Sequence, residues 1–256
     1  QKTLQKDLKT LLIKKMNKIA VILAAGLGSR IKEFSSLKPK GFIEINGISL
    51  IERSINILIN AGISKIYIGT GYKSAFYDQL KSKYPCITTL KNVNFSNTGS
   101  FHTLYILNNL ISEDFILLES DLLYDKSVIT PLLKEDANDI IISSDFTNSG
   151  DEVYVIQEDK RLIKLTKLPD KSEIPESEFV GISKISLSLY QKMCKNYEGI
   201  DSSKIEYEEL FNNCAEENKI FIKNIKQLPW CEIDNKTHYK RAIDVVSPKI
   251  IQNEKI

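Results

Sequence analysis

The stretch IAVILAAGLGSRIKEFSSLKPK, residues 19–40, joins an apolar run to a glycine-rich turn and a group of cations. Residues 19–23 have the composition of a strand in a parallel sheet covered on both faces. Gly26 and Gly28 follow, and glycine lets backbone N–H groups approach a phosphate closely. Arg30 and Lys40 then add positive charge. The stretch therefore predicts a phosphate-binding loop at the end of a buried strand.

Several interpretations compete for this loop. A dinucleotide-binding fold needs a third glycine where Ile31 stands, and an acid that would end the second strand. A Walker loop needs Gly-Lys-Ser or Gly-Lys-Thr, which is absent here. A third arrangement uses Arg30, Lys38 and Lys40 as cations on a triphosphate. A purely structural turn would not need those cations nearby.

The apolar pattern around the loop predicts an α/β fold. Strands are expected at residues 19–23, 65–69, 87–90, 115–118 and 139–143, and helices at 48–61, 74–83, 98–110 and 126–134. This alternation predicts a Rossmann-like, doubly wound sheet with right-handed crossovers. An antiparallel excursion is expected at 152–157, 161–167 and 179–185. Helices at 187–196 and 206–218, strands at 220–225 and 230–233, and a helix from about residue 236 would complete a mixed sheet.

The chain of 256 residues, 42% of them hydrophobic, suits one large domain, which we place at residues 18–246. Leucines at helical spacing predict an N-terminal helical extension at residues 1–17. The polar residues 247–256 are expected to form a linker to a further C-terminal region, because the chain starts at Gln1 and both ends look cut.

Composition argues against several classes of protein. The net charge of +2 and the lack of an apolar run near the roughly 20 residues of a membrane span argue against nucleic-acid and membrane binding. The four cysteines form no C-x-x-C pair, which suits thiols in a reducing cytoplasm. The two histidines lack a cluster of soft ligands, so a zinc site is not expected.

The segment LAAGLGSR followed by KPK resembles the signature of nucleotidyltransferases, which join a nucleoside triphosphate to a phosphorylated small molecule. Their pattern is L-A-A-G-x-G-[ST]-R, a spacer and then P-K, and the spacing here matches at every position. The resemblance implies a GT-A-like nucleotidyltransferase fold and phosphate contacts by Arg30 and Lys40. The triphosphate loop that it implies consists of Leu23, Ala24, Ala25, Gly26, Leu27, Gly28, Ser29 and Arg30.

Two aspartates are candidates for a metal site. Asp121 follows the apolar run FILLES, and the carboxyl end of a parallel strand faces the ligand crevice of an open sheet. Asp234 follows a short late strand, in WCEIDN. Each could instead cap a helix or lie in a solvated loop. The resemblance implies that Asp121 holds Mg²⁺, and Asp234 could converge on the same hard cation.

Two further segments resemble the cytidylyltransferases that act on phosphocholine: EID at residues 232–234 and FVGIS at 179–183. The segment NTGS, with Asn97, Thr98 and Ser100, stands where sugar nucleotidyltransferases read the base with Gln-x-Gly-Thr. This departure leaves the base open on residues alone, whereas the phosphocholine group favours cytosine. Gly71 and Tyr72, after the second strand, are expected to form another wall of the base pocket.

The acceptor pocket distinguishes the phosphorus-containing substrates. A quaternary ammonium favours aromatic faces, whereas a primary ammonium favours carboxylates and other hydrogen-bond acceptors. Cys231 stands where an aromatic residue is expected, and Trp230 is one step off register, which turns a strand side chain to the other face. The residues expected at the acceptor are Asp145, Asp151, Glu152, Tyr154, Gly181 and Trp230. These acids favour an aminoethyl group.

We therefore predict a Mg²⁺-dependent enzyme that transfers CMP from CTP to a small acceptor and releases pyrophosphate. We expect 2-aminoethylphosphonate as acceptor, with phosphoethanolamine or phosphocholine next. The predicted catalytic residues are Arg30, Lys40, Asp121 and Asp234, with both aspartates on the metal. A sugar-1-phosphate nucleotidyltransferase is the alternative enzyme. A non-catalytic nucleotide-sensing module is the other alternative, and the presence of all four residues argues against it.

Overall fold

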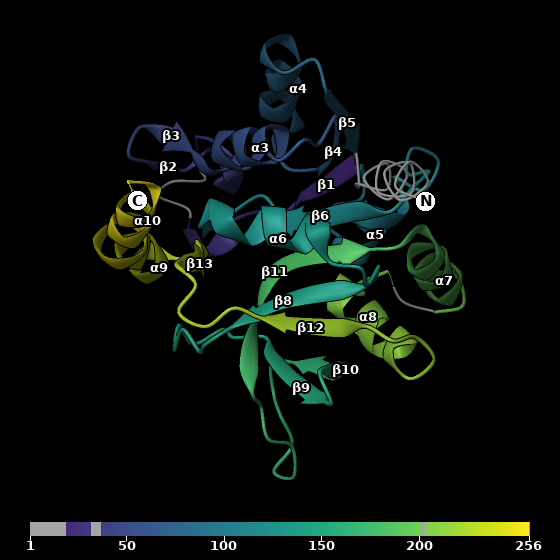
Figure 1. The fold of residues 1–256 in the computed structure, drawn as a ribbon. Helices are drawn as coiled ribbons and strands as arrows, with labels where there is room; N and C mark the ends of the chain where they lie inside the picture. The colour runs from purple at the N-terminus through teal and green to yellow at the C-terminus, as the bar shows by residue number, and fades with distance from the viewer. Residues whose placement is uncertain (1–18, 32–36, 201–202, 256) are drawn as a thin grey trace, which may run out of the picture.

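The computed structural model describes residues 19–31, 37–200 and 203–255, and it contains a nine-stranded mixed sheet with helices on both faces (Figure 1). The predicted extension at residues 1–17 lies outside the described residues. Four strands form the parallel half of the sheet, in the order β5-β4-β1-β6. They are β1 (Ile19–Ala24), β4 (Lys65–Thr70), β5 (Ile87–Lys91) and β6 (Phe115–Glu119). This half confirms the doubly wound arrangement that the alternation of strands and helices predicts.

The other half of the sheet is mixed. Its strands are β8 (Ile140–Ser144), β9 (Tyr154–Glu158), β10 (Arg161–Thr166), β11 (Ser177–Ile185) and β12 (Phe221–Asn224). Strand β11 pairs antiparallel with both β6 and β8, and the order continues through β12 and β10 to β9. Strand β9 also pairs with β11, so this end of the sheet curls back on itself. The predicted antiparallel excursion is this curled end.

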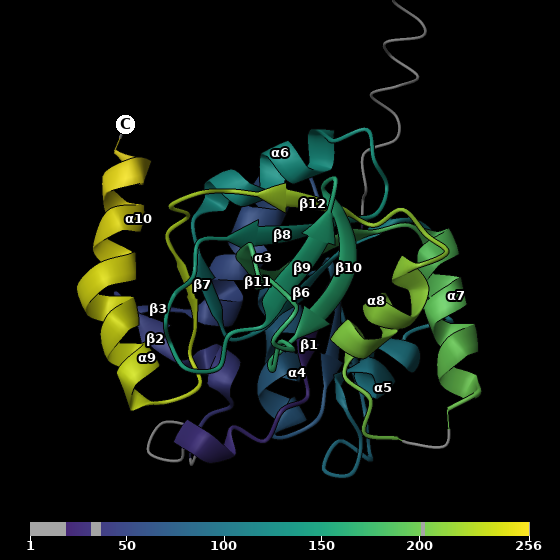
Figure 2. The same cartoon turned by 90° about the horizontal axis from the view of Figure 1, so that it is seen from below.

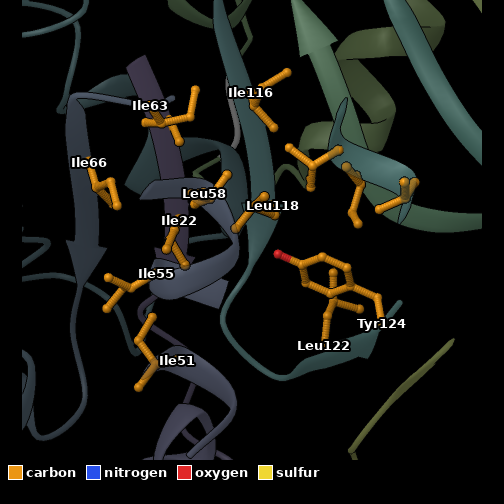
Figure 3. Close-up of a cluster of buried hydrophobic side chains, with 14 of the residues drawn as sticks. Ile22, Ile51, Ile55, Leu58, Ile63, Ile66, Ile116, Leu118, Leu122 and Tyr124 are labelled. Atoms are coloured by element: carbon orange, nitrogen blue, oxygen red, sulfur yellow. The ribbon is translucent and has the colours of Figure 1, made fainter. Parts of the chain in front are cut away.

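Apolar helix faces cover the two sides of the sheet. Helices α3 (Leu50–Asn60), α4 (Ser74–Lys83) and α6 (Ile129–Lys134) share one buried cluster with the sheet. In Figure 3, Ile55 and Leu58 of α3 lie with Ile22 of β1 and Leu118 of β6. A second cluster buries α5 (Ser100–Tyr105), α7 (Leu187–Glu198) and α8 (Tyr207–Ala215). Figure 2 shows these three helices grouped on one side of the molecule.

A third, smaller cluster lies beside the carboxyl end of β6 and contains elements that the apolar pattern did not reveal. They are the hairpin β2 (Glu44–Ile45) and β3 (Ile48–Ser49), and strand β7 (Leu122–Tyr124), which pairs with β13 (Trp230–Glu232). Two-residue and three-residue strands are too short to show a periodicity of their own. The short pairing β7–β13 nevertheless decides where the predicted catalytic residues meet.

The C-terminal residues differ from the expected linker. Helix α9 (Lys236–Arg241) continues through one π-helical turn (Ala242–Val246) into α10 (Ser247–Glu254). Ile250 is buried in the third cluster, and the Asn253 amide donates to Asp125 over 2.8 Å. Residues 247–254 therefore pack on the domain, because an apolar residue of α10 reaches the core despite the polar composition of the segment.

Helix α5 is shorter than the predicted helix at 98–110. Residues 97–99 precede it, and Gly99 N–H donates to Ser203 O over 2.8 Å. A Cβ atom at Gly99 would lie 2.2 Å from Ile205 O, so the absence of a side chain permits this close approach. After Tyr105 the chain continues in turns rather than as a helix. None of the described helices combines the length and the apolar character needed to cross a membrane.

Candidate active site

The pairing of β7 with β13 brings the two predicted metal-binding aspartates together. Asp121 lies between β6 and β7, and Asp234 follows β13. The antiparallel register places Glu232 opposite Leu122, and Ile233 N–H donates to Asp121 O over 3.1 Å. Both aspartate side chains are largely buried. Two segments that are distant in sequence thus meet at the carboxyl end of the parallel strands.

Lys40 lies between the two carboxylates. Its Nζ is 3.1 Å from Asp121 Oδ2 and also bonds Asp234 Oδ1. Burial alone would lower the pKa of Lys40, but the negative charges of Asp121 and Asp234 outweigh it and raise that pKa. Burial alone would raise the pKa of Asp234, but the positive charge of Lys40 outweighs burial and holds that pKa below its usual range. Lys40 therefore carries its positive charge at the centre of the site.

Arg30 extends this network toward solvent. Its guanidinium donates to Asp234 Oδ2 over 2.5 Å and to Asp151 Oδ2 over 3.4 Å. Its side chain is 57% exposed, so it can turn toward an incoming anion without crossing the core. The planar guanidinium suits phosphate oxygens.

A cleft of about 770 Å³ opens beside this network. The predicted nucleotide-binding residues that line it are Leu23, Ala24, Ala25, Gly26, Leu27, Arg30, Thr98 and Ser100. Its opposite wall comes from β10 and α8 and includes Lys164 and Lys167, which the sequence did not single out. The cleft thus runs from the glycine-rich loop across the edge of the sheet to the antiparallel excursion.

Four predicted nucleotide-binding residues are not among those that line the cleft: Gly28, Gly71, Tyr72 and Asn97. The side chain of Ser29 lies outside the described part of the chain. Gly28 has φ +63° and precedes the short turn Ser29–Ile31. Tyr72 N–H donates to Ala25 O over 3.3 Å, and a Cβ atom at Gly71 would lie 2.7 Å from the same oxygen. Gly71 and Tyr72 therefore pack against the backbone of the glycine-rich loop at Ala25.

A second, smaller cavity of about 40 Å³ adjoins the cleft. The two share Glu119, Val153, Glu208 and Glu232 as lining residues. Glu119 accepts a hydrogen bond from Tyr207 Oη over 2.7 Å. Glu208 Oε2 is buried, and none of the described residues donates a hydrogen bond to it. Such an unpaired buried carboxylate oxygen is costly unless a ligand supplies a donor.

Burial changes the protonation of this acidic cavity. It raises the pKa of Glu119 to about 8, with a further contribution from the charge of Asp121. It raises the pKa of Glu208 to about 7, and that of Glu178, also in the cavity wall, to about 7. The pKa of Glu232 is raised as well, first by burial and then by Glu119 and Asp121. A cation in the cavity would stabilise the ionised forms.

The acidic residues offer hard oxygen ligands of the kind that Mg²⁺ prefers. Asp121 belongs to two overlapping sets. It shares the ammonium of Lys40 with Asp234, and its carboxylate lies within 4.8 Å of those of Glu119 and Glu232. The ammonium of Lys40 already occupies a position between the carboxylates of Asp121 and Asp234. The oxygen atoms around this position therefore fit a divalent cation. Glu119 and Glu232 each stand two residues before a predicted aspartate, and this spacing is the signal that the sequence contained for them.

The predicted acceptor residues fall into two groups. Asp151, Gly181 and Trp230 line the acidic cavity. Asp145, Glu152 and Tyr154 do not line it: Asp145 accepts from Gln227 N–H, Glu152 accepts from Gly150 N–H, and Tyr154 packs edge-on against Phe146. The residues at 152–154 lie where the chain becomes extended, so neighbouring side chains point to opposite sides, and Val153 faces the cavity.

Comparisons with known proteins give the family and the fold of the chain. The profile of the MobA-like NTP transferase domain matches residues 20–169. The chain is 22% identical over 223 residues to the 2-aminoethylphosphonate cytidylyltransferase of Lancefieldella rimae, covering 84% of this chain and 88% of that protein. It is 30% identical over 135 residues to the choline-phosphate cytidylyltransferase of Streptococcus pneumoniae, covering 53% of this chain and 58% of that protein. The inositol-1-phosphate CTP transferase of T. maritima has the same fold, with a TM-score of 0.79, 15% identity, and coverage of 93% of this chain and 96% of that one.

Proposed function

Because the chain belongs to the MobA-like NTP transferase family, we propose that it transfers CMP from CTP to 2-aminoethylphosphonate and releases pyrophosphate. Phosphoethanolamine and phosphocholine are the next acceptors in order of expected efficiency. The choice of cytosine rests on the cytidylyltransferases among its relatives. The choice of a primary amine rests on the acidic cavity.

The reaction needs positioning and charge neutralisation more than a protein nucleophile. An oxygen of the acceptor's phosphonate attacks the α-phosphorus of CTP, and the bond from that phosphorus to the bridging oxygen of the leaving pyrophosphate breaks. The acceptor oxygen is already ionised, so no side chain has to remove a proton from it. Arg30 and the amides of the glycine-rich loop would hold the leaving phosphates. Lys40 would neutralise the charge that develops at the α-phosphate.

A divalent cation fits the acidic end of this site. Asp121 and Asp234 would hold Mg²⁺, and Glu119 and Glu232 stand close enough to contribute to its binding. When bound, the metal supplies Lewis-acid stabilisation of phosphate oxygens. Lys40 would then leave its position between the two aspartates and turn to the nucleotide.

The acidic cavity is the observation that carries the choice of acceptor. It opens from the nucleotide cleft at Glu119, Glu208 and Glu232, so a short acceptor could span from the α-phosphate into it. A primary ammonium would donate to Glu208 Oε2, which is buried and otherwise unpaired among the described residues. It would also offset the charges of the neighbouring carboxylates. Methylation of the nitrogen removes all three N–H donors, and each unpaired acceptor then costs about 1–3 kcal/mol.

Pyrophosphate release tests the proposal. The protein would be incubated with Mg²⁺, each of the four nucleoside triphosphates, and 2-aminoethylphosphonate, phosphoethanolamine or phosphocholine. We expect CTP to be preferred, and kcat/KM for 2-aminoethylphosphonate to exceed that for phosphocholine by about 10- to 100-fold. If phosphocholine were the better acceptor by tenfold or more, the assignment of the acidic cavity to a primary ammonium would fail.

Two other functions give different results in the same assay. A sugar-1-phosphate nucleotidyltransferase would release pyrophosphate with a hexose 1-phosphate and UTP or dTTP. A nucleotide-sensing module would bind a triphosphate but release no pyrophosphate with any acceptor. The network of Arg30, Lys40, Asp121 and Asp234 favours an enzyme, since a binding module does not need a buried lysine between two carboxylates.

A further inference from the structure

His238 has a position that the proposed chemistry does not explain. It lies in the first turn of α9, four residues after Asp234, and only 3% of it is exposed. Its backbone N–H donates to Asn235 Oδ1 over 3.0 Å, so the cap of the helix fixes the residue. The lack of other soft ligands in the sequence argued against a metal-binding role for it. His238 is one of the residues that line the acidic cavity, and its ring also contacts Asp234.

The imidazole bridges Asp234 to a segment of the acidic cavity. Asp234 N–H donates to Nδ1 over 3.4 Å, which requires the proton to be on Nε2. Nε2 lies 3.4 Å from Ser149 O and 3.6 Å from Asp151 Oδ1. Nδ1 of this buried side chain thus faces a hydrogen-bond donor, and Nε2 faces two acceptors.

Residues 147–152, the segment that His238 contacts, form one wall of the acidic cavity. Glu178 holds the beginning of this segment by accepting from Thr147 N–H and Oγ1. Ser149 Oγ donates to Asp151 Oδ1 over 3.0 Å and so orients that carboxylate. Asn148 and Gly150 have positive φ angles of 53° and 97°, as expected for a tight reversal. The shape of the wall therefore depends on contacts at its two ends.

Arg30 also joins Asp151 to Asp234. In the proposed reaction, however, its guanidinium turns to the leaving phosphates. The contact through His238 is buried, and the proposed reaction gives His238 no role on the phosphates, so this contact does not have to break when nucleotide binds. We propose that His238 is a positioning residue that keeps residues 147–152 against the Asp234 end of the site and so maintains the acceptor cavity. This inference rests on the proposed function, since it assigns the cavity to the acceptor.

Two substitutions at one position separate this role from simple packing. His238→Leu fills much of the space but removes both hydrogen-bonding atoms. His238→Gln keeps one acceptor and one donor on a side chain of similar reach. With 2-aminoethylphosphonate and CTP, we expect the leucine variant to raise the KM for the acceptor about tenfold, the cost of roughly one buried hydrogen bond. The KM for CTP should change by less than about threefold, because no ring atom faces the cleft, and the glutamine variant should recover most of the loss.

Hydrogen exchange gives a second measurement that does not need turnover. In His238→Leu, amides of residues 147–152 should exchange faster than in the wild type, whereas those of β1 should not. Equal losses in both variants, or an equal rise in both KM values, would overturn the inference, as would unchanged exchange at 147–152 in the leucine variant. If the wild type used none of the acceptors, the proposed function would fail, and the exchange measurement would still decide whether His238 holds this segment.

Discussion

The glycine-rich loop and the acidic cavity lie side by side, but they are assembled in opposite ways. The loop is one continuous run of residues at the end of β1, and its backbone is the surface that we propose for the phosphates. The cavity is lined by residues from β6, β7, the 147–153 segment, β11, α8, β13 and α9, which are distant from one another in the sequence. A surface made from contiguous backbone depends on local chemistry, whereas a cavity made from scattered side chains depends on strand pairing. The glycine-rich loop should therefore act equally with every acceptor, and the acidic cavity should select among acceptors.

The largest effect is expected at Asp121, on the nucleotide side of this comparison. Asp121→Asn makes one ionic metal ligand neutral and should lower kcat/KM by about 10²–10³-fold. The loss should be the same for all three acceptors. Pyrophosphate release at saturating Mg²⁺ measures it, and Asp136→Asn, which changes an exposed aspartate, is the matched control. Near-normal turnover would contradict the assignment of Asp121.

Lys40→Ala should have the next largest effect. If Lys40 acts on charge that develops during the reaction, kcat should fall by about 10²-fold while the KM for CTP rises much less. Steady-state kinetics at varied CTP separate the two parameters. Lys38→Ala is the control, because the ammonium of Lys38 bonds the exposed Glu44 instead. A change in KM alone would make Lys40 a binding residue only.

Glu208 tests the cavity side of the comparison. Glu208→Gln removes the negative charge while keeping the shape, and should lower kcat/KM for 2-aminoethylphosphonate about tenfold. The value for phosphocholine should change less, since its nitrogen has no N–H to donate. The ratio of the two is the measurement, with Glu216→Gln, exposed at the other end of α8, as control. If both acceptors were affected equally, the cavity would not select by the ammonium group.

The smallest effect concerns stability and pH. Glu119 and Glu208 have pKa values raised to about 8 and about 7 by burial, above the unfolded value of 4.5. Between these values the folded protein binds more protons than the unfolded chain, so stability should fall as pH rises from about 5 to 8. Thermal unfolding without ligands should show the decline. In Glu208→Gln it should be shallower, with a Tm at pH 8 about 2–4 °C higher per kcal/mol regained. An unchanged slope would show that Glu208 does not titrate in this range.

The same contrast explains how much the sequence could predict. The parallel strands were predicted well because each is an apolar run between turns. The glycine-rich loop could be singled out because its glycines and cations lie within one segment, and its phosphate binding stays a prediction. Lys40, Asp121 and Asp234 were predicted as functional residues, and they meet in the structure. Asp121 and Asp234 meet through the β7–β13 pairing, in which each strand has three residues.

The acidic cavity was predicted less completely. Glu208 stands in the run EYEEL, where helical periodicity cannot distinguish a carboxylate that faces a cavity from one that faces solvent. Asp145 was expected near the acceptor, but the chain turns after β8 and the side chain pairs with the backbone of Gln227. Val153 and Tyr154 are neighbours on an extended chain, so their side chains point to opposite sides. The sequence alone does not indicate which of the two faces the cavity. Long-range pairing supplied the information that was missing.

The π-helical turn between α9 and α10 has a consequence for how the end of the chain tolerates change. An α-helix turns by about 100° per residue, and the wider turn at Ala242–Val246 absorbs an extra residue. The side chains of α10 therefore point in directions that differ from those they would have if α9 continued as a regular α-helix. The turn lies between His238, whose ring accepts from Asp234 N–H, and Ile250, which is buried in the third hydrophobic cluster. Deleting one residue from this turn would rotate α10 by about 100° against α9, and would detach Ile250 and Asn253 from their partners without altering either helix itself.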